Sequence, residues 1–261
     1  MIGNWPEELF VESGAFYEKV LESYEEQTPA EVEFLLSRLE ADEVGPGSRI
    51  LDLCCGIGRH SLALAEEGYD IVGFDLAPRF VERAENDAAE RGLQDRTRFV
   101  RGDMRKVADV LEDESFDAVI NLFSSFGFYD EKANQSVLEQ CLDLTRPDGI
   151  FIIDTLNRDW LMRNFQRQGI MGYEDVMVVE QRSFDHEQGR SKSRWRLMEK
   201  TDEATWRVEG EVDVAIRVYT LNELIREFGD AGWLHVETFG SLTGDRFELG
   251  SRRLTCVFKA P

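Results

Sequence analysis

Short apolar segments alternate with amphipathic segments along the middle of the chain. Each apolar run has the length of a buried strand and is followed by a stretch in which apolar residues recur at helical spacing. Strands are expected at residues 49–53, 70–74, 98–101, 116–122 and 150–154, with two more at 234–239 and 254–259. Strands that alternate with helices in this way predict a doubly wound α/β fold, a Rossmann-like sheet of seven mostly parallel strands.

Two regions lie outside this alternation. Residues 1–45 show the spacing of amphipathic helices, and Thr28 to Glu31 has the pattern of a helix start with a capping Thr28. Residues 172–219 alternate apolar and polar positions, which predicts an antiparallel insert of about three strands, and Thr220 to Glu223 predicts the start of a last helix. The expected parts are N-terminal helices and α/β core at 1–171, a β cap at 172–219, and the rest of the core at 220–261.

Composition narrows the class of protein. No apolar run approaches the roughly 18 residues of a membrane span, and the first residues lack the pattern of a signal peptide, which predicts a cytoplasmic protein. The spacing of Cys54, Cys55, Cys141 and Cys256 is not that of a disulfide framework, and the adjacent pair is expected to pack a tight turn without a metal.

Acidic residues far outnumber basic ones. The chain has 52 Asp and Glu against 30 Lys and Arg, a formal net charge of −22. Such a charge disfavours nucleic acids and anionic membranes as partners. Many acids with few lysines fit either an ordinary soluble acidic protein or a host that lives at high salt or high temperature.

The most informative stretch is Ser48–Ser61, SRILDLCCGIGRHS. It predicts a buried strand, a glycine turn and a helix whose free N–H groups point back into the turn. Gly56 and Gly58 permit a tight turn and the close approach of a ligand. Asp52 would repel a pyrophosphate, and Ser61 replaces the glycine or alanine of a dinucleotide fingerprint. A carboxylate at this place instead suits a cationic ligand such as S-adenosylmethionine (SAM).

Residues 51–58, LDLCCGIG, resemble motif I of class I SAM-dependent methyltransferases, with Cys54 in place of the usual first glycine. Asp75 ends the next strand about 20 residues later, where nucleotide-binding sheets hold ribose hydroxyls. The resemblance implies that Asp103 accepts a hydrogen bond from adenine. Residues 123–129 are similar to the methyl-donor side of small-molecule N-methyltransferases, including the amino-sugar dimethyltransferases. The cofactor-binding residues expected from this resemblance are Asp52, Cys54, Gly56, Gly58, Asp75, Leu76, Asp103, Met104, Asn121 and Leu122.

The activity implied is methyl transfer from SAM to a small molecule, most readily at nitrogen, with S-adenosylhomocysteine (SAH) as the second product. A neutral amine needs alignment and exclusion of water more than it needs a strong base. His60, beside the glycine turn, is expected to pack the cofactor pocket, and Arg158 could bind a substrate carboxylate. The candidates for a catalytic role are Tyr17, Arg105, Ser124, Tyr129, Asn157 and Arg158.

The sequence is compatible with several other functions. The chain could bind SAM without catalysis, methylate a protein, or be an NAD-dependent oxidoreductase, which Asp52 and Ser61 disfavour. The insert could fold over the cofactor cleft and, with residues 1–45, wall a closed pocket that suits a small acceptor. It could instead form a homodimer interface, for which Trp195 and Trp206 are suited.

Overall fold

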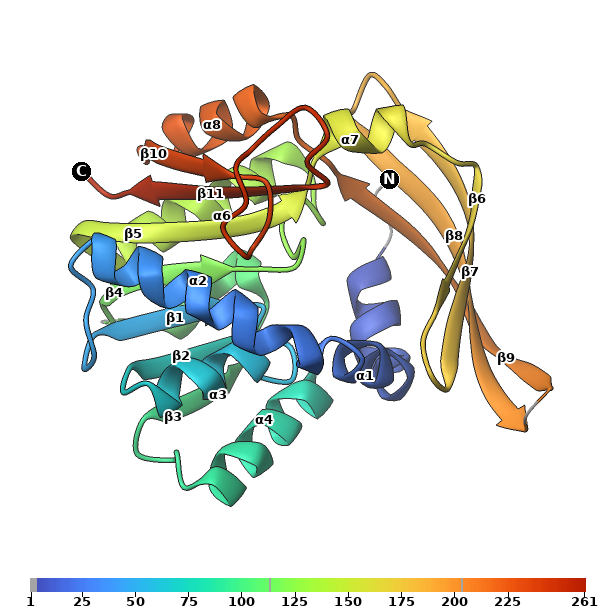
Figure 1. The fold of residues 1–261 in the computed structure, drawn as a ribbon, viewed down its shortest axis with the longest axis horizontal. Coiled ribbons are helices and arrows are strands. Elements are labelled where there is room, and N and C mark those ends of the chain that lie inside the picture. The colour runs from blue at the N-terminus through green and yellow to red at the C-terminus, as the bar shows by residue number, and fades with distance from the viewer. Residues whose placement is uncertain (1–3, 113, 203) are drawn as a thin grey trace.

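The computed structural model describes residues 4–112, 114–202 and 204–261, and its centre is a seven-stranded sheet (Figure 1). The strand order is β10-β11-β5-β4-β1-β2-β3. The strands are β1 (Arg49–Leu53), β2 (Asp70–Asp75), β3 (Thr97–Arg101), β4 (Phe116–Asn121), β5 (Thr145–Leu156), β10 (Leu234–Phe239) and β11 (Arg253–Lys259). β1 to β5 pair in parallel, whereas β11 pairs antiparallel with β5 and with β10. The expected doubly wound, mostly parallel sheet is confirmed.

Helices cover both faces of this sheet, which explains why its central strands are apolar at nearly every position. The helices are α2 (Thr28–Ala41), α3 (Arg59–Glu66), α4 (Pro78–Arg91), α6 (Glu131–Asp143) and α8 (Leu221–Asp230), with shorter turns at η3 (Met104–Lys106), α5 (Val107–Val110) and α7 (Arg158–Arg163). On one face Ile50, Ile120 and Ile152 pack with residues of α2 and α3. On the other, Leu51 and Phe151 pack with residues of α6 and α8. Successive strand residues therefore enter opposite cores.

The N-terminal region is helical, as expected, and consists of η1 (Glu7–Glu12), α1 (Gly14–Glu22), η2 (Glu25–Gln27) and α2. The predicted cap is wrong. Thr28 lies inside α2, the residue before the helix is Gln27, and no side chain caps that end. Thr28 and Glu31 are instead buried and bind Arg59, because an arginine under α2 offers both side chains a partner within the protein.

A second sheet stands beside the first, with α1 between them in the view of Figure 1. Its strands, in order across the sheet, are β6 (Gln168–Gly172), β7 (Val176–Asp185), β8 (Arg190–Asp202) and β9 (Thr205–Arg217), all antiparallel. The three strands expected within residues 172–219 are present as β7, β8 and β9, and β6, which ends at the start of that range, is a fourth that the sequence pattern does not predict. The inner face carries buried apolar residues such as Val178 and Leu197, whereas Arg194 and Asp213 form an exposed ion pair.

The last helix, α8, begins as the sequence predicts. The side chain of Thr220 accepts a hydrogen bond from the backbone of Glu223, and the Glu223 side chain accepts one from the backbone of Thr220. This reciprocal pair is a capping box. No helix in the described ranges is long and apolar enough to cross a membrane.

Candidate active site

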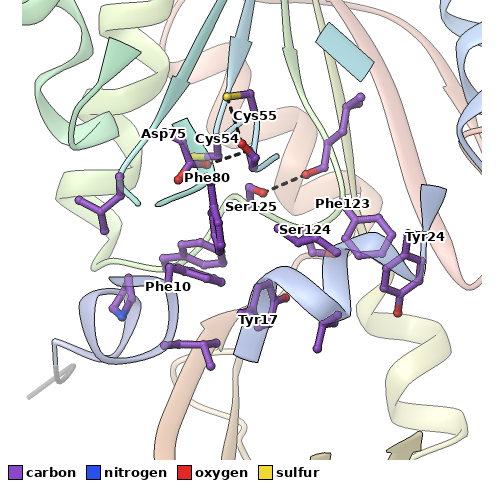
Figure 2. Close-up of a pocket in the computed structure, with 18 of the residues that line it drawn as sticks. Phe10, Tyr17, Tyr24, Cys54, Cys55, Asp75, Phe80, Phe123, Ser124 and Ser125 are labelled. Carbon is purple, nitrogen blue, oxygen red and sulfur yellow. Dashed lines mark hydrogen bonds between the residues drawn. The ribbon is translucent and has the colours of Figure 1, made fainter. Parts of the chain in front are cut away.

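A cavity of about 320 Å³ lies at the carboxyl ends of β1, β2 and β4, and the second sheet and the N-terminal helices form its other walls. In open α/β sheets this edge is where small molecules bind. Figure 2 shows Asp75 and Cys54 at one part of the cavity and Tyr17, Tyr24 and Phe123 at another. The first group, together with Asp52 and Gly56, is called the sheet wall here. The aromatic group, together with Tyr173 and Trp195 of the second sheet, is called the cap wall.

The glycine turn after β1 depends on left-handed backbone. Gly56 and Gly58 have φ of +57° and +78°, and Cys54 has φ of +64°. Cys54 therefore keeps the backbone conformation that glycine adopts most easily, although it carries a side chain. A Cβ at Gly58 would lie 2.8 Å from the Cβ of Ala84, so only glycine fits at this contact with α4.

Asp75 holds the glycine turn in place from the end of β2. Its Oδ2 accepts a hydrogen bond from the backbone N–H of Gly56 at 2.9 Å, and its Oδ1 accepts one from Ala77 at 2.9 Å. Burial raises the pKa of this carboxyl, and the backbone donors partly offset the shift. Each carboxylate oxygen keeps a second lone pair, so Asp75 can still accept hydrogen bonds from a ligand in the cavity.

Asp52 is the second acid of the sheet wall. Its side chain is buried and accepts a hydrogen bond from Ser61 Oγ at 2.6 Å. Burial raises its pKa to about 7; the Ser61 hydrogen bond opposes that rise and the charge of Asp75 adds to it. A cationic ligand beside Asp52 would favour its ionised form, so this site can change its charge when a ligand binds.

A strained turn follows β4 and leads into the cap wall. Phe123 and Ser124 have φ of +62° and +66°, which is uncommon for residues with side chains. Asp154 at the end of β5 holds both residues, because its Oδ2 accepts from the backbone N–H of Phe123 at 3.3 Å and its carbonyl accepts from that of Ser124 at 2.9 Å. Arg253 and Thr255 donate to the same carboxylate. The position of the Phe123 ring is therefore set by neighbouring strands.

Comparison with known proteins shows that the sequence around this cavity is similar to that of methyltransferases. Residues 50–149 match the family model described as "Methyltransferase domain". A glycine/sarcosine N-methyltransferase from Aphanothece halophytica is 32% identical over 137 residues, which cover 52% of this chain and 49% of that protein. A ubiquinone biosynthesis O-methyltransferase from Xanthomonas axonopodis is 32% identical over 132 residues, covering 50% of each.

Over residues 50–149 the chain thus resembles a methyltransferase domain. A solved SAM-dependent methyltransferase from Clostridium acetobutylicum shares the fold with a TM-score of 0.79 at 15% identity, over 94% of this chain and 98% of that one. The chain spans about half the length of the curated relatives it matches.

The methyltransferase domain brings most of the expected cofactor residues to the cavity. Those that line it are Asp52, Cys54, Gly56, Asp75, Leu76, Met104 and Leu122, and Cys55, Ile57 and Gly102 lie among them. Three others are not among the lining residues. Gly58 packs against α4, and both oxygens of Asp103 accept from Arg105. Asn121 is buried, and its Nδ2 donates to the carbonyl of Leu53.

Of the six candidates for a catalytic role, three line the cavity and three do not. Tyr17, Ser124 and Tyr129 line the cavity of the methyltransferase domain. Arg105 pairs with Asp103 and lies over the Tyr129 ring, 4.2 Å from its centroid.

Asn157 and Arg158 have structural partners instead. Asn157 caps α7 and donates to the carbonyl of Ser251, and Arg158 pairs with Glu223 at 3.0 Å. Neither of them lines the cavity.

His60 lines the cavity and takes part in a buried charge network. Glu31 accepts hydrogen bonds from His60 Nε2 at 2.9 Å and from Arg59. Burial disfavours the ionised form of Glu31, but the bonds from His60 and Arg59 outweigh it and lower the Glu31 pKa to about 2. Burial also lowers the pKa of His60, so its ring is neutral near pH 7.

Several lining residues are not among the site residues expected from the sequence, and four of them come from late in the chain. Met171 lies on β6 and Tyr173 directly after it, whereas Arg253 begins β11 and Arg252 directly precedes it. Their local sequence has no motif that marks a site. They reach the cavity only because β6 faces it and β11 inserts next to β5.

Proposed function

We propose that this protein transfers the methyl group of SAM to a nitrogen atom of a small molecule enclosed in the cavity. The enclosure is the observation that carries the proposal. Tyr24 and Tyr173 hydroxyls lie 3.0 Å apart and join the N-terminal helices to the second sheet, and Lys19 pairs with Glu199 across the same junction. A wall opposite the sheet favours an acceptor that fits inside over the surface of a folded protein or a nucleic acid.

The sheet wall fits SAM through its charge and shape. When bound, SAM supplies a methyl group on a sulfonium, which a nitrogen lone pair can take to leave the neutral thioether SAH. We assign Asp75 to the ribose hydroxyls and Asp52 to the cationic end, because these are the two acids that line the cavity. Cys54 and Met104 lie with their sulfur atoms 3.7 Å apart and provide an apolar contact beside them.

The tyrosine and histidine side chains that line the cavity favour nitrogen as the methylated atom. Burial raises the pKa of Tyr17 and of Tyr129, so both phenols keep their protons at neutral pH. The His60 Nε2–H donates to the Glu31 carboxylate. Phenols that stay protonated suit an acceptor that attacks without first losing a proton, as a neutral amine does. The similarity to a glycine/sarcosine N-methyltransferase supports the same assignment.

The protein's work in this reaction is alignment and exclusion of water. The rings of Phe10, Tyr17 and Phe128 pack in contact, with centroids 4.9 Å apart for Phe10 and Tyr17 and 5.7 Å apart for Phe10 and Phe128. Such a wall desolvates the reacting atoms and holds them in one orientation. Positioning of this kind accounts for a large part of the rate of a displacement at carbon.

The test uses paired acceptors. Purified protein and SAM are incubated with a panel of primary and secondary amines and with alcohols of the same carbon skeleton, and SAH release and product mass are measured. At least one amine should gain 14 mass units per methyl group, while its alcohol partner should not react. Methylation of alcohols alone would contradict the choice of nitrogen. Methyl transfer to added proteins with no reaction of any small molecule would favour a protein methyltransferase, and SAH binding without turnover would favour a non-catalytic module.

A further inference from the structure

The cavity holds a concentration of positive charge that the proposed reaction does not use. Its charged lining residues are two acids of the sheet wall, Asp52 and Asp75, and three arginines, Arg59, Arg252 and Arg253. In a chain of net charge −22, three arginines around one cavity are an exception to the general charge pattern. Grouped guanidinium groups most readily recognise carboxylates and phosphates.

Two of these arginines, Arg59 and Arg253, lie over the ring of Phe123. The Cζ atoms of Arg59 and Arg253 lie 5.5 Å and 5.7 Å from the centroid of its ring. Tyr24, part of the cap wall, meets the same ring with a centroid distance of 4.4 Å. The two guanidinium groups are therefore held beside the aromatic end of the cavity, where we place the acceptor.

The arginines are only partly neutralised within the protein. Glu31 pairs with Arg59, and Asp154 pairs with Arg253. Arg252 makes no ion pair among the described residues, and its guanidinium lies 5.3 Å from the ring centroid of Trp160. Of the three guanidinium groups, that of Arg252 is therefore the one without an acidic partner among the described residues.

Arg59 also has an unused donor. Its side chain is more than nine-tenths buried, with 9% of its surface exposed, and Nη1 donates to Thr28 and Glu31. Nη2 is buried and has no hydrogen-bond partner within the part of the chain that the structure describes. A buried charged donor without a partner is costly, so a ligand oxygen at this position would be bound strongly.

We infer that Arg59, with Arg252 and Arg253, binds a carboxylate of the methyl acceptor, so that the substrate is an amino acid-like compound with an amine and a carboxylate. This inference rests on the proposed function. Sheet order favours the acceptor over the cofactor as the source of the carboxylate. Arg253 lies on β11 and Phe123 follows β4, whereas Asp75 lies on β2, on the opposite side of β1. The sequence suggested Arg158 as the residue that binds a substrate carboxylate. We assign that binding instead to the three arginines that line the cavity.

The test measures binding, which does not require turnover. Acetate, benzoate and phenylacetate, each beside its uncharged amide, are titrated calorimetrically into the protein saturated with SAH. At least one carboxylate should bind about tenfold more tightly than its amide, as a charged hydrogen bond provides. Arg59→Gln should remove that preference. Arg38→Gln is the matched control, because Arg38 also has a buried donor without a described partner but does not line the cavity.

A second variant covers the case in which Arg59→Gln fails to fold because Glu31 loses its partner. Arg252 is exposed at the cavity, so Arg252→Gln should fold normally and weaken carboxylate binding about two- to fivefold at low salt. An unchanged carboxylate affinity in Arg252→Gln would overturn the assignment. A wild-type protein that binds amides as well as carboxylates would also overturn it.

The source of the carboxylate is tested with two cofactor fragments. SAH carries a carboxylate, and 5′-methylthioadenosine lacks the amino acid end. Arg59→Gln should bind both as wild type does. If Arg59→Gln weakens SAH at least about tenfold and leaves methylthioadenosine unchanged, Arg59 binds the cofactor and the acceptor assignment is wrong. If wild-type protein binds neither, the proposed function itself fails, which is a separate result.

Discussion

The two walls of the cavity are built in different ways. The sheet wall consists largely of backbone, with left-handed residues at Cys54 and Gly56 and with Asp75 tied to N–H groups of the turn. The cap wall consists of large side chains from distant segments. Tyr24 and Tyr173, for example, are 149 residues apart in the sequence and share a hydrogen bond.

This difference matches the two ligands, cofactor and acceptor, that the proposed methyl transfer requires. A backbone-built wall accepts few substitutions, because each change alters φ and ψ, and it suits a ligand that never varies. In a wall of side chains, single residues can be substituted without altering the backbone. Such a wall suits a ligand that differs between related proteins, as the acceptor does. We therefore expect sheet-wall variants to lose the cofactor and cap-wall variants to lose the acceptor.

The largest effect is expected from Asp75→Ala. This variant removes two hydrogen bonds that hold the glycine turn and the acceptors that we assign to the ribose. Each charged hydrogen bond contributes about 1.5–3 kcal/mol, so SAH affinity measured by calorimetry should fall at least about tenfold and up to about a hundredfold.

The matched control for Asp75 is Asp70→Ala, at the other end of β2. Asp70 is half exposed and pairs with Arg96 on the surface, away from the cavity. Its removal should leave SAH affinity unchanged. Equal losses in the two variants would show that β2 is destabilised as a whole and would remove the special role of the strand's carboxyl end.

A pH dependence gives the next largest effect. Burial holds the pKa of Asp52 at about 7 in the free protein, whereas the ammonium group of SAH favours the ionised carboxylate. Binding below pH 7 must then release a proton, so SAH affinity should rise with pH up to about 7 and level off above it. The slope approaches about tenfold per pH unit well below that value.

Asp52→Asn provides the comparison for this pH profile. The amide cannot titrate, so its SAH affinity should be low and nearly independent of pH between about 5 and 8. A wild-type profile that is flat over this range, or a variant that keeps the wild-type slope, would mean that Asp52 is not the titrating group.

Much of the fold could be predicted from the sequence, because its signals are local. The apolar strands and helical spacings of the core recur at short range, and the capping box of Thr220 and Glu223 lies within four residues. The sheet wall could be placed for the same reason. Asp52 is the next-to-last residue of β1 and Asp75 ends β2, and in a parallel sheet these strand ends share one edge.

The rest depends on contacts between distant segments. β6 contains two glycines in five residues and becomes a strand only by pairing with β7. Thr28 and Glu31 have a capping pattern, but Arg59 recruits both of them into the core. The arginines of β11 and the aromatic residues of the second sheet reach the cavity through topology, which no short motif records.

The claim that the sheet wall binds the cofactor and the cap wall binds the acceptor is tested most directly by Trp195→Ala. The measurements are SAH affinity and turnover of an amine identified with the panel of amines and alcohols described above. Trp195 lines the cavity, whereas Trp206 on the neighbouring β9 does not, so Trp206→Ala is the matched control. If the two walls bind different ligands, Trp195→Ala should bind SAH within about twofold of wild type while its kcat/KM falls about tenfold, and Trp206→Ala should change neither. An SAH affinity lowered tenfold in Trp195→Ala, or a kcat/KM equal to that of wild type, would contradict it.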